Sequence, residues 1–241
     1  MRVVVLGCGT GVGKTRLSVA LLRALVARGV PALGLKPIES GVVRQGTGAS
    51  PPVGSDAAAL ALAGSVQTSE LHPLYALRDA VSPHLAARSV GLSIDVKRVA
   101  AWVTRAETAM TPDVASSSAA WTIVETAGGV FSPLAPGFAN FELAQALEPA
   151  IWVLVASDAL GVLHDVSSTW KAMRASGREP DHLVLSGARE PDASTGRNAA
   201  ELAMLGVATP SAVLARNDDR GVNGLLERLL ADEAGRGLNA R

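Results

Sequence analysis

The sequence has a single cysteine, few aromatic residues and no excess of either charge. The lone Cys8 excludes an internal disulfide and a metal cage built from cysteines. The 22 basic residues balance the 22 acidic ones, so we expect no nucleic-acid partner and no polybasic membrane surface. No stretch approaches the about 18 uninterrupted apolar residues that a membrane-spanning helix needs. These absences favour a cytoplasmic protein whose partners are small molecules.

Apolar residues are abundant, at 48% of 241, which is enough to bury the core of one domain spanning residues 1–241. Short β-rich runs alternate with longer runs rich in alanine and leucine, as is typical of a parallel sheet flanked by helices. Strands are expected at residues 2–7, 32–38, 121–125, 150–157, 182–188 and 210–215. Helices are expected at 15–29, from near Asp56 through a long helical middle, and near Val222–Ala234, with loops at 110–120 and 189–198.

The first expected strand leads into the segment GCGTGVGKTRLS, Gly7–Ser18. The usual phosphate-binding pattern G-x-x-x-x-G-K-[ST] would need glycine at position 8, but with Gly7 as the first glycine the loop is simply one residue longer. Backbone N–H groups of such a loop bind phosphate oxygens, the lysine reaches the terminal phosphates, and the next hydroxyl binds Mg²⁺. The sequence therefore predicts an α/β fold of the P-loop NTPase type, with a mostly parallel sheet and helices on both faces. The predicted nucleotide-binding residues of the loop are Gly9, Thr10, Gly11, Val12, Gly13, Lys14 and Thr15.

Three charged residues stand where further chemistry is expected. Lys36 and Glu125 each come at the end of an apolar strand, and the carboxyl ends of parallel strands share one edge of a sheet. Asp56 begins a helix, where Ser55 or Asp56 itself is also expected to cap the first turn. Mg²⁺ in a nucleotide site takes one or two carboxylates besides the loop hydroxyl and phosphate oxygens. Thr15, Asp56 and Glu125 are therefore the predicted metal ligands.

The chain resembles the dethiobiotin synthetase family in an ordered set of short motifs. The phosphate loop is followed by LKPIESG (35–41), SDA (55–57), VSPH (81–84) and VETAGG (124–129). The resemblance implies a homodimeric ligase of biotin biosynthesis that uses ATP and Mg²⁺ to close a cyclic urea on 7,8-diaminopelargonate with carbon dioxide. It implies that Lys14 and Lys36 are catalytic and bracket the transferred phosphoryl group. The substrate-binding residues that it implies are Ser40, Gly128 and Gly129, with Leu160 and Gly161 at a turn near the dimer interface.

Two positions depart from the family pattern. Gly11 stands two residues before the Gly-Lys pair, where an acidic residue is usual. Ser186 follows the strand HLVL, where the family commonly has an asparagine that reads adenine. A serine offers one hydroxyl where an amide offers a paired donor and acceptor. Ser186 is therefore predicted to contact the nucleotide with weak base selectivity, so that other nucleoside triphosphates are accepted besides ATP.

Other classes of protein stay open at this point. The segment ETAGG resembles the switch D-T-A-G-Q of small GTPases, although no N-K-x-D sequence occurs to read guanine. A partitioning ATPase of the MinD/ParA type would be expected to have a second lysine early in the loop and a basic surface or amphipathic tail. An amidotransferase-linked cobyrinate synthetase would need a glutaminase domain with a reactive cysteine.

Four further residues receive an interpretation from the sequence. His84, after a proline at a helix start, is either a catalytic base or a structural residue. His164 is weighed as a contact of the substrate carboxylate against plain packing. Cys8 is expected to fill space in the loop, although neighbouring helix charge could lower its pKa. Glu39 is interpreted as a solvated loop residue.

Overall fold

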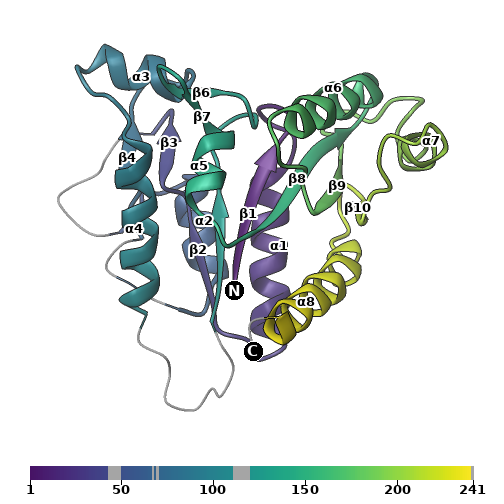
Figure 1. Cartoon of the computed structure of the whole chain (residues 1–241), viewed down its shortest axis with the longest axis horizontal. Helices are drawn as coiled ribbons and strands as arrows, with labels where there is room; N and C mark the ends of the chain where they lie inside the picture. The colour runs from purple at the N-terminus through teal and green to yellow at the C-terminus, as the bar shows by residue number, and fades with distance from the viewer. Residues whose placement is uncertain (43–49, 67, 69–70, 111–119, 240–241) are drawn as a thin grey trace.

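The computed structural model describes residues 1–42, 50–66, 68, 71–110 and 120–239 (Figure 1), with side chains described as far as residue 235. Its centre is a parallel sheet of six strands in the order β10-β9-β8-β1-β5-β2. In chain order these strands are β1 (Arg2–Gly7), β2 (Ala32–Leu35), β5 (Trp121–Glu125), β8 (Ile151–Asp158), β9 (His182–Gly187) and β10 (Ala212–Leu214). The mostly parallel sheet of the sequence prediction is confirmed.

Alternation along the strands builds two cores, one on each face of the sheet. In β1, Val3 and Val5 belong to one core, and Val4 and Leu6 belong to the other. The first core is closed by α1 (Lys14–Ala27), α2 (Asp56–Ala63) and α8 (Gly221–Asn239). The second is closed by α3 (Pro83–Ser89), α4 (Val96–Thr108), α5 (Asn140–Ala146), α6 (Val162–Ala175) and α7 (Asn198–Met204). Helices therefore cover both faces, as predicted (Figure 1).

The structure differs from the prediction at one interrupted strand and at two short strand pairs outside the central sheet. The expected strand at 32–38 is divided, because Pro37 has no N–H to donate to a ladder. Its second part, β3 (Ile38–Ser40), pairs in parallel with β4 (Tyr75–Leu77), inside the expected helical middle. A hairpin of β6 (Pro133–Ala135) and β7 (Phe138–Ala139) was not predicted. Most of the expected loop at 110–120 lies outside the described residues.

The sheet order places the phosphate loop at the point where the direction of strand addition reverses. Strand β1 lies between β5 and β8, and its carboxyl end leads into residues 8–13 and then into α1. Lys36 directly follows β2, and Glu125 is the last residue of β5. Ligands in open α/β sheets bind at this kind of switch point. No helix among the described residues has the length and apolar character to cross a membrane.

Candidate functional site

The phosphate loop has a backbone conformation that requires glycine. Gly11 and Gly13 have φ angles of 73° and 98°, in the left-handed region that L side chains rarely adopt. A Cβ on Gly13 would also lie 2.2 Å from Oγ of Ser186, so this glycine packs directly on the end of β9. Gly13 caps the N-terminus of α1, whose first residue is Lys14. The loop thus delivers backbone N–H groups and the positive end of a helix to one place, which suits an anion.

Lys14 folds back over this loop. Its Nζ donates a hydrogen bond to the carbonyl oxygen of Gly9 at 2.9 Å. The side chain is buried, and this burial, reinforced by the nearby charge of Lys36, lowers the pKa of Lys14 to about 8. No carboxylate among the described residues forms an ion pair with this ammonium, so it gains from an anion brought into the site.

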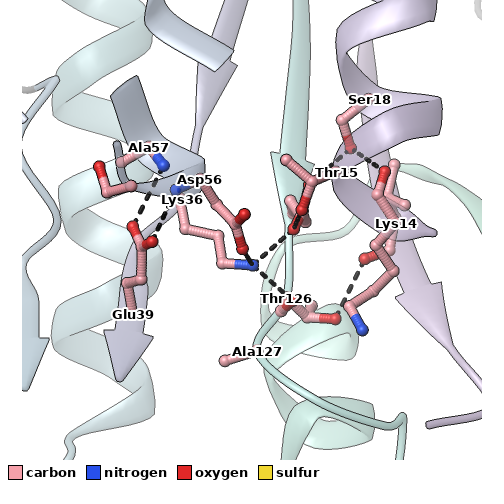
Figure 2. Close-up of polar contacts among 12 residues, drawn as sticks. Lys14, Thr15, Ser18, Lys36, Glu39, Asp56, Ala57, Thr126 and Ala127 are labelled. Atoms are coloured by element: carbon pink, nitrogen blue, oxygen red, sulfur yellow. Dashed lines mark hydrogen bonds and ion pairs between the residues drawn. The ribbon is translucent and has the colours of Figure 1, made fainter. Parts of the chain in front are cut away.

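Lys36 joins two of the predicted metal ligands. Its Nζ lies 3.0 Å from Oδ2 of Asp56 and 2.5 Å from Oε1 of Glu125. Figure 2 shows the side chains of Lys36 and Asp56 pointing toward one another across the carboxyl edge of the sheet. Burial alone would lower the pKa of Lys36, but the two carboxylates outweigh burial and raise it. The sequence prediction that Lys36 and Glu125 meet at one sheet edge agrees with this geometry, and Asp56 joins them from the start of α2.

Glu125 is completely buried and fully engaged. Its Oε1 also accepts a hydrogen bond from the hydroxyl of Thr15 at 2.8 Å, and its Oε2 accepts one from Ser18 Oγ at 2.9 Å. Sequence reasoning missed Ser18, although its place three residues after Thr15 puts both hydroxyls on one face of α1. Ser18 therefore fixes one oxygen of Glu125, while the other faces Thr15 and Lys36.

The interpretation of Glu39 as a solvated loop residue was wrong. Its side chain is buried, and its two carboxylate oxygens accept the backbone N–H groups of Asp56 at 2.7 Å and Ala57 at 3.1 Å (Figure 2). Ser55 caps the same turn by accepting the N–H of Ala58, as expected. Burial, first of all, raises the pKa of Glu39. Glu39 and Ser55 together fix the start of α2, and with it the position of Asp56.

The oxygen donors at this edge fit a hard divalent cation. Lys36 Nζ lies beside the carboxylates of Asp56 and Glu125, and the hydroxyl of Thr15 donates to the same oxygen of Glu125. The charges of Lys36, Asp56 and Glu125 together are net negative. Mg²⁺ prefers such oxygen ligands and takes only one or two carboxylates in a nucleotide site. Within the described ranges no group of three His, Cys, Asp or Glu residues could hold a metal, so the set depends on the hydroxyl and on substrate oxygens.

Two adjoining cavities open beside these residues. The first, of about 380 Å³, is lined by Thr10, Gly11, Gly13, Lys14, Thr15, Arg16, Lys36, Glu39, Ser40, Asp56, Glu125, Ala127, Gly128 and Arg189. The second, of about 330 Å³, shares four residues with the first, Thr10, Ser40, Ala127 and Gly128, and extends to Ser82, Pro83 and Ser132. Many of the predicted phosphate, metal and substrate residues thus line two neighbouring cavities: Thr10, Gly11, Gly13, Lys14, Thr15, Lys36, Ser40, Asp56, Glu125 and Gly128.

The turn after β5 that contains Gly128 and Gly129, here called the glycine turn, is held by the buried side-chain amide of Asn140. Asn140 Nδ2 donates to the carbonyl oxygens of Ala127 at 2.6 Å and Gly129 at 2.8 Å. The N–H of Gly129 donates to Ser132 Oγ at 2.9 Å, and a Cβ on Gly129 would lie 3.3 Å from the carbonyl oxygen of Cys8. The turn therefore packs closely on the phosphate loop. Sequence reasoning did not identify Asn140 or Ser132.

Some predicted site residues do not line either cavity. Ser186 is buried beneath Gly13, and Leu160 and Gly161 lie at the N-terminus of α6, where Leu160 is 85% exposed. Gly9, Val12 and Gly129 belong to the framework of the loop and the glycine turn. The parts that these residues play in binding remain predictions.

The two histidines weighed from the sequence also lie outside both linings. His84 Nδ1 is 3.0 Å from the hydroxyl of Ser82, at the start of α3, which favours its structural interpretation. His164 lies exposed in the first turn of α6. The structure therefore gives neither imidazole a place beside the phosphate loop.

The pKa of the Cys8 thiol is raised, whereas the neighbouring helix charge considered from the sequence would lower it. Burial raises its pKa to about 11, and the charge of Lys14 only partly offsets this effect. At pH 8 we expect iodoacetamide to alkylate Cys8 roughly a hundredfold more slowly in the folded protein than in the unfolded chain, because the thiolate fraction falls tenfold per pKa unit. Mass spectrometry of timed samples measures both rates on the only cysteine. Equal rates would contradict the burial of the thiol.

Comparisons with known proteins bear on the family of the chain. A family model described as an AAA domain matches residues 1–219. A relative from Anaeromyxobacter dehalogenans (strain 2CP-C), named ATP-dependent dethiobiotin synthetase BioD, is 36% identical over 212 residues, which cover 87% of each protein. A protein of the same name from Nitrosospira multiformis is 36% identical over 171 residues, covering 71% of this chain and 69% of the relative.

Two solved structures share the architecture at low sequence identity. The ParA family ATPase of Chlorobium tepidum has a TM-score of 0.53 and 14% identity, with 94% of this chain and 89% of that chain covered. The MinC:MinD cell division complex of Aquifex aeolicus has a TM-score of 0.51 and 12% identity, with 95% of each chain covered. At these identities the likeness extends to the fold alone.

Proposed function

Because the chain belongs to the dethiobiotin synthetase family, we propose that its phosphate loop and the two adjoining cavities form the site at which the ureido ring of dethiobiotin is closed. The protein is an ATP-dependent ligase of biotin biosynthesis that acts on 7,8-diaminopelargonate and carbon dioxide. A partitioning role of the MinD/ParA type has only the shared fold in its support.

The observation that carries the assignment of the site is the shared wall of the two cavities. Thr10, Ser40 and Gly128 line both, so molecules bound in the two cavities would contact the same three residues. ATP in the first cavity would place its terminal phosphate near Lys14 and Lys36, with the diamine in the second. Such juxtaposition of two reactants replaces a bimolecular encounter with a step inside one complex.

In the proposed sequence of events one amine of the diamine adds to carbon dioxide and gives a carbamate. A carbamate oxygen attacks the γ-phosphorus of ATP, and ADP leaves. The second amine then attacks the carbonyl carbon of the mixed anhydride, phosphate leaves, and the ring closes. Lys14 and Lys36 would offset the charge of the transferring phosphoryl group, since phosphoryl transfer depends chiefly on positioning and electrostatic stabilisation. The backbone of the glycine turn, together with Ser40, would hold the diamine.

We further propose that Thr15, Asp56 and Glu125 hold the Mg²⁺ of the nucleotide. The ion would supply charge neutralisation on the phosphate oxygens. The hydrogen bonds of Glu39 and Ser18 support this assignment, because Ser18 holds one carboxylate oxygen of Glu125 and Glu39 holds the backbone at Asp56. A cytoplasmic enzyme is also proposed.

A homodimer is proposed as the working form, with the substrate carboxylate near the N-terminus of α6. In such a dimer the partner would cover Leu160, a large apolar side chain beside that helix end that is 85% exposed. Analytical ultracentrifugation would decide it: a monomer at assay concentrations would contradict the proposal.

The function is tested with purified protein by measuring phosphate release that depends on both diaminopelargonate and bicarbonate, together with detection of dethiobiotin by mass spectrometry. We expect both substrates to be required and one ring to be formed per phosphate released. If the diamine did not change the rate of nucleotide hydrolysis, the result would contradict the ligase assignment and favour a nucleotide switch.

We expect ATP, CTP and GTP to support the reaction with kcat/KM values within about tenfold of one another, because small contact differences are worth only about 1 kcal/mol. Ser186 is buried beneath Gly13, so its single hydroxyl is poorly placed to read the edge of a base. Initial rates at saturating diamine and bicarbonate give the three values. An ATP preference of about a thousandfold would mean that another group reads adenine.

A further inference from the structure

Four cations line the first cavity, and they differ in how their charges are balanced. Lys36 is paired with Asp56 and Glu125. Arg16 is paired with Asp219 at 2.8 Å and also donates to backbone carbonyl oxygens of the segment after β10. Both of these cations are therefore paired with carboxylates of the protein itself, although the buried Nη1 of Arg16 has no hydrogen-bond partner among the described residues.

The other two cations are not satisfied in this way. Within the part of the chain that the structure describes, Lys14 Nζ donates only to a carbonyl oxygen of the phosphate loop. Arg189 makes no hydrogen bond and no ion pair with any residue in the described ranges, although it lines the cavity beside the phosphate loop. Since guanidinium groups bind phosphate through paired hydrogen bonds, an unpaired arginine at a phosphate loop is suited to a polyphosphate.

The backbone just before Arg189 is closely packed against its neighbours. Arg189 follows the end of β9 by two residues, after Gly187 and the buried Ala188. A Cβ on Gly187 would lie 2.5 Å from the backbone nitrogen of Arg216, so this strand end packs closely against the segment after β10. The guanidinium is therefore presented to the cavity from a packed sheet edge.

We propose that Arg189 binds the triphosphate of the nucleotide. After Lys14, it is the second cation of the cavity that forms no ion pair with a carboxylate of the described residues. The proposal rests on the proposed function and deepens it by adding a residue of the loop after β9 to the nucleotide site. A nucleoside triphosphate with its Mg²⁺ still carries net negative charge, which these two cations would offset. The contact is to phosphate, so it does not depend on the base.

Isothermal titration with ATP and with inorganic tripolyphosphate, both in excess Mg²⁺, tests the proposal. We expect Arg189→Gln to weaken binding of both ligands about tenfold or more, the range of one charge-assisted contact, and Arg189→Lys to recover part of the loss. Arg197→Gln is the matched control, because Arg197 is exposed in the same loop and lies outside the cavity lining. Since Arg189 is exposed, we expect thermal unfolding of all three variants to match that of the wild type.

Unchanged binding of tripolyphosphate by Arg189→Gln would overturn the proposal, even if ATP binding weakened, because the contact would then be to base or ribose. An equal loss in Arg197→Gln would also overturn it, since a general charge effect would explain the result. Diamine-dependent phosphate release by the wild type, measured beside the titrations, tests the proposed function independently of the role of Arg189. Its absence would refute the function, while polyphosphate binding would still decide the role of Arg189.

Discussion

Replacing Lys36 by alanine will lower turnover at least roughly a hundredfold, the scale of losing a preorganised charge at a transition state. Lys36 Nζ stands between Asp56 and Glu125 at the carboxyl edge of the sheet, where the phosphoryl group is proposed to pass. The same change will lower the melting temperature, because it leaves Glu125 buried without its cation. Phosphate release at saturating substrates, measured well below that temperature, gives the effect on chemistry.

Two comparison variants separate chemistry from folding in this experiment. Lys97→Ala removes an exposed lysine of α4 and should leave both turnover and melting temperature unchanged. The double variant Lys36→Met, Glu125→Gln replaces the buried pair by neutral groups of similar size and should recover most of the lost stability. Turnover of Lys36→Ala close to that of the wild type would remove Lys36 from the site.

Replacing Lys14 by alanine will also lower turnover at least roughly a hundredfold, but with the opposite effect on folding. Lys14 has no carboxylate partner among the described residues, and burial has lowered its pKa to about 8. Folding therefore disfavours its charge, so we expect the melting temperature of Lys14→Ala to equal or exceed that of the wild type. Calorimetry and titration with ATP measure the two effects on the same sample.

The control for this variant is Lys171→Ala, on an exposed part of α6 outside both cavities. It should bind ATP as the wild type does. If Lys14→Ala kept wild-type affinity for ATP, the loop would not be the phosphate site. If Lys14→Ala melted at a much lower temperature than the wild type, the inference that the buried charge of Lys14 destabilises the fold would be wrong.

The sequence was most informative where chemistry follows directly from a strand end. Lys36 and Glu125 could be placed together because parallel strands share a carboxyl edge, and the structure brings their charged atoms within 2.5 Å. The phosphate loop was recognisable because its glycines, lysine and threonine are adjacent in the chain. In both cases local order in the sequence was enough to predict nearness in space.

The missed residues depend on contacts that no local pattern encodes. Glu39 caps α2 from β3, the short strand that follows the break at Pro37 and is far in sequence from the helix start that it caps. Asn140 reaches the glycine turn from the start of α5, and Arg189 enters the cavity from a loop without periodicity. Ser18 differs from these, because its helical spacing from Thr15 offered a signal.

The central position of β1 also bears on how the chain reaches its folded state. Val3 pairs with Ile123 on one side and with Ile151 on the other, so the first strand has to wait for segments from the middle of the chain before its neighbours exist. Contacts so distant in sequence slow folding, because the entropy of closing large loops is lost before pairing compensates for it. A nascent or truncated chain ending before β5 would contain the whole phosphate loop and still lack β5 and β8, the strands that flank β1. Recovery of nucleotide affinity during refolding would therefore report the completed sheet rather than its earliest part.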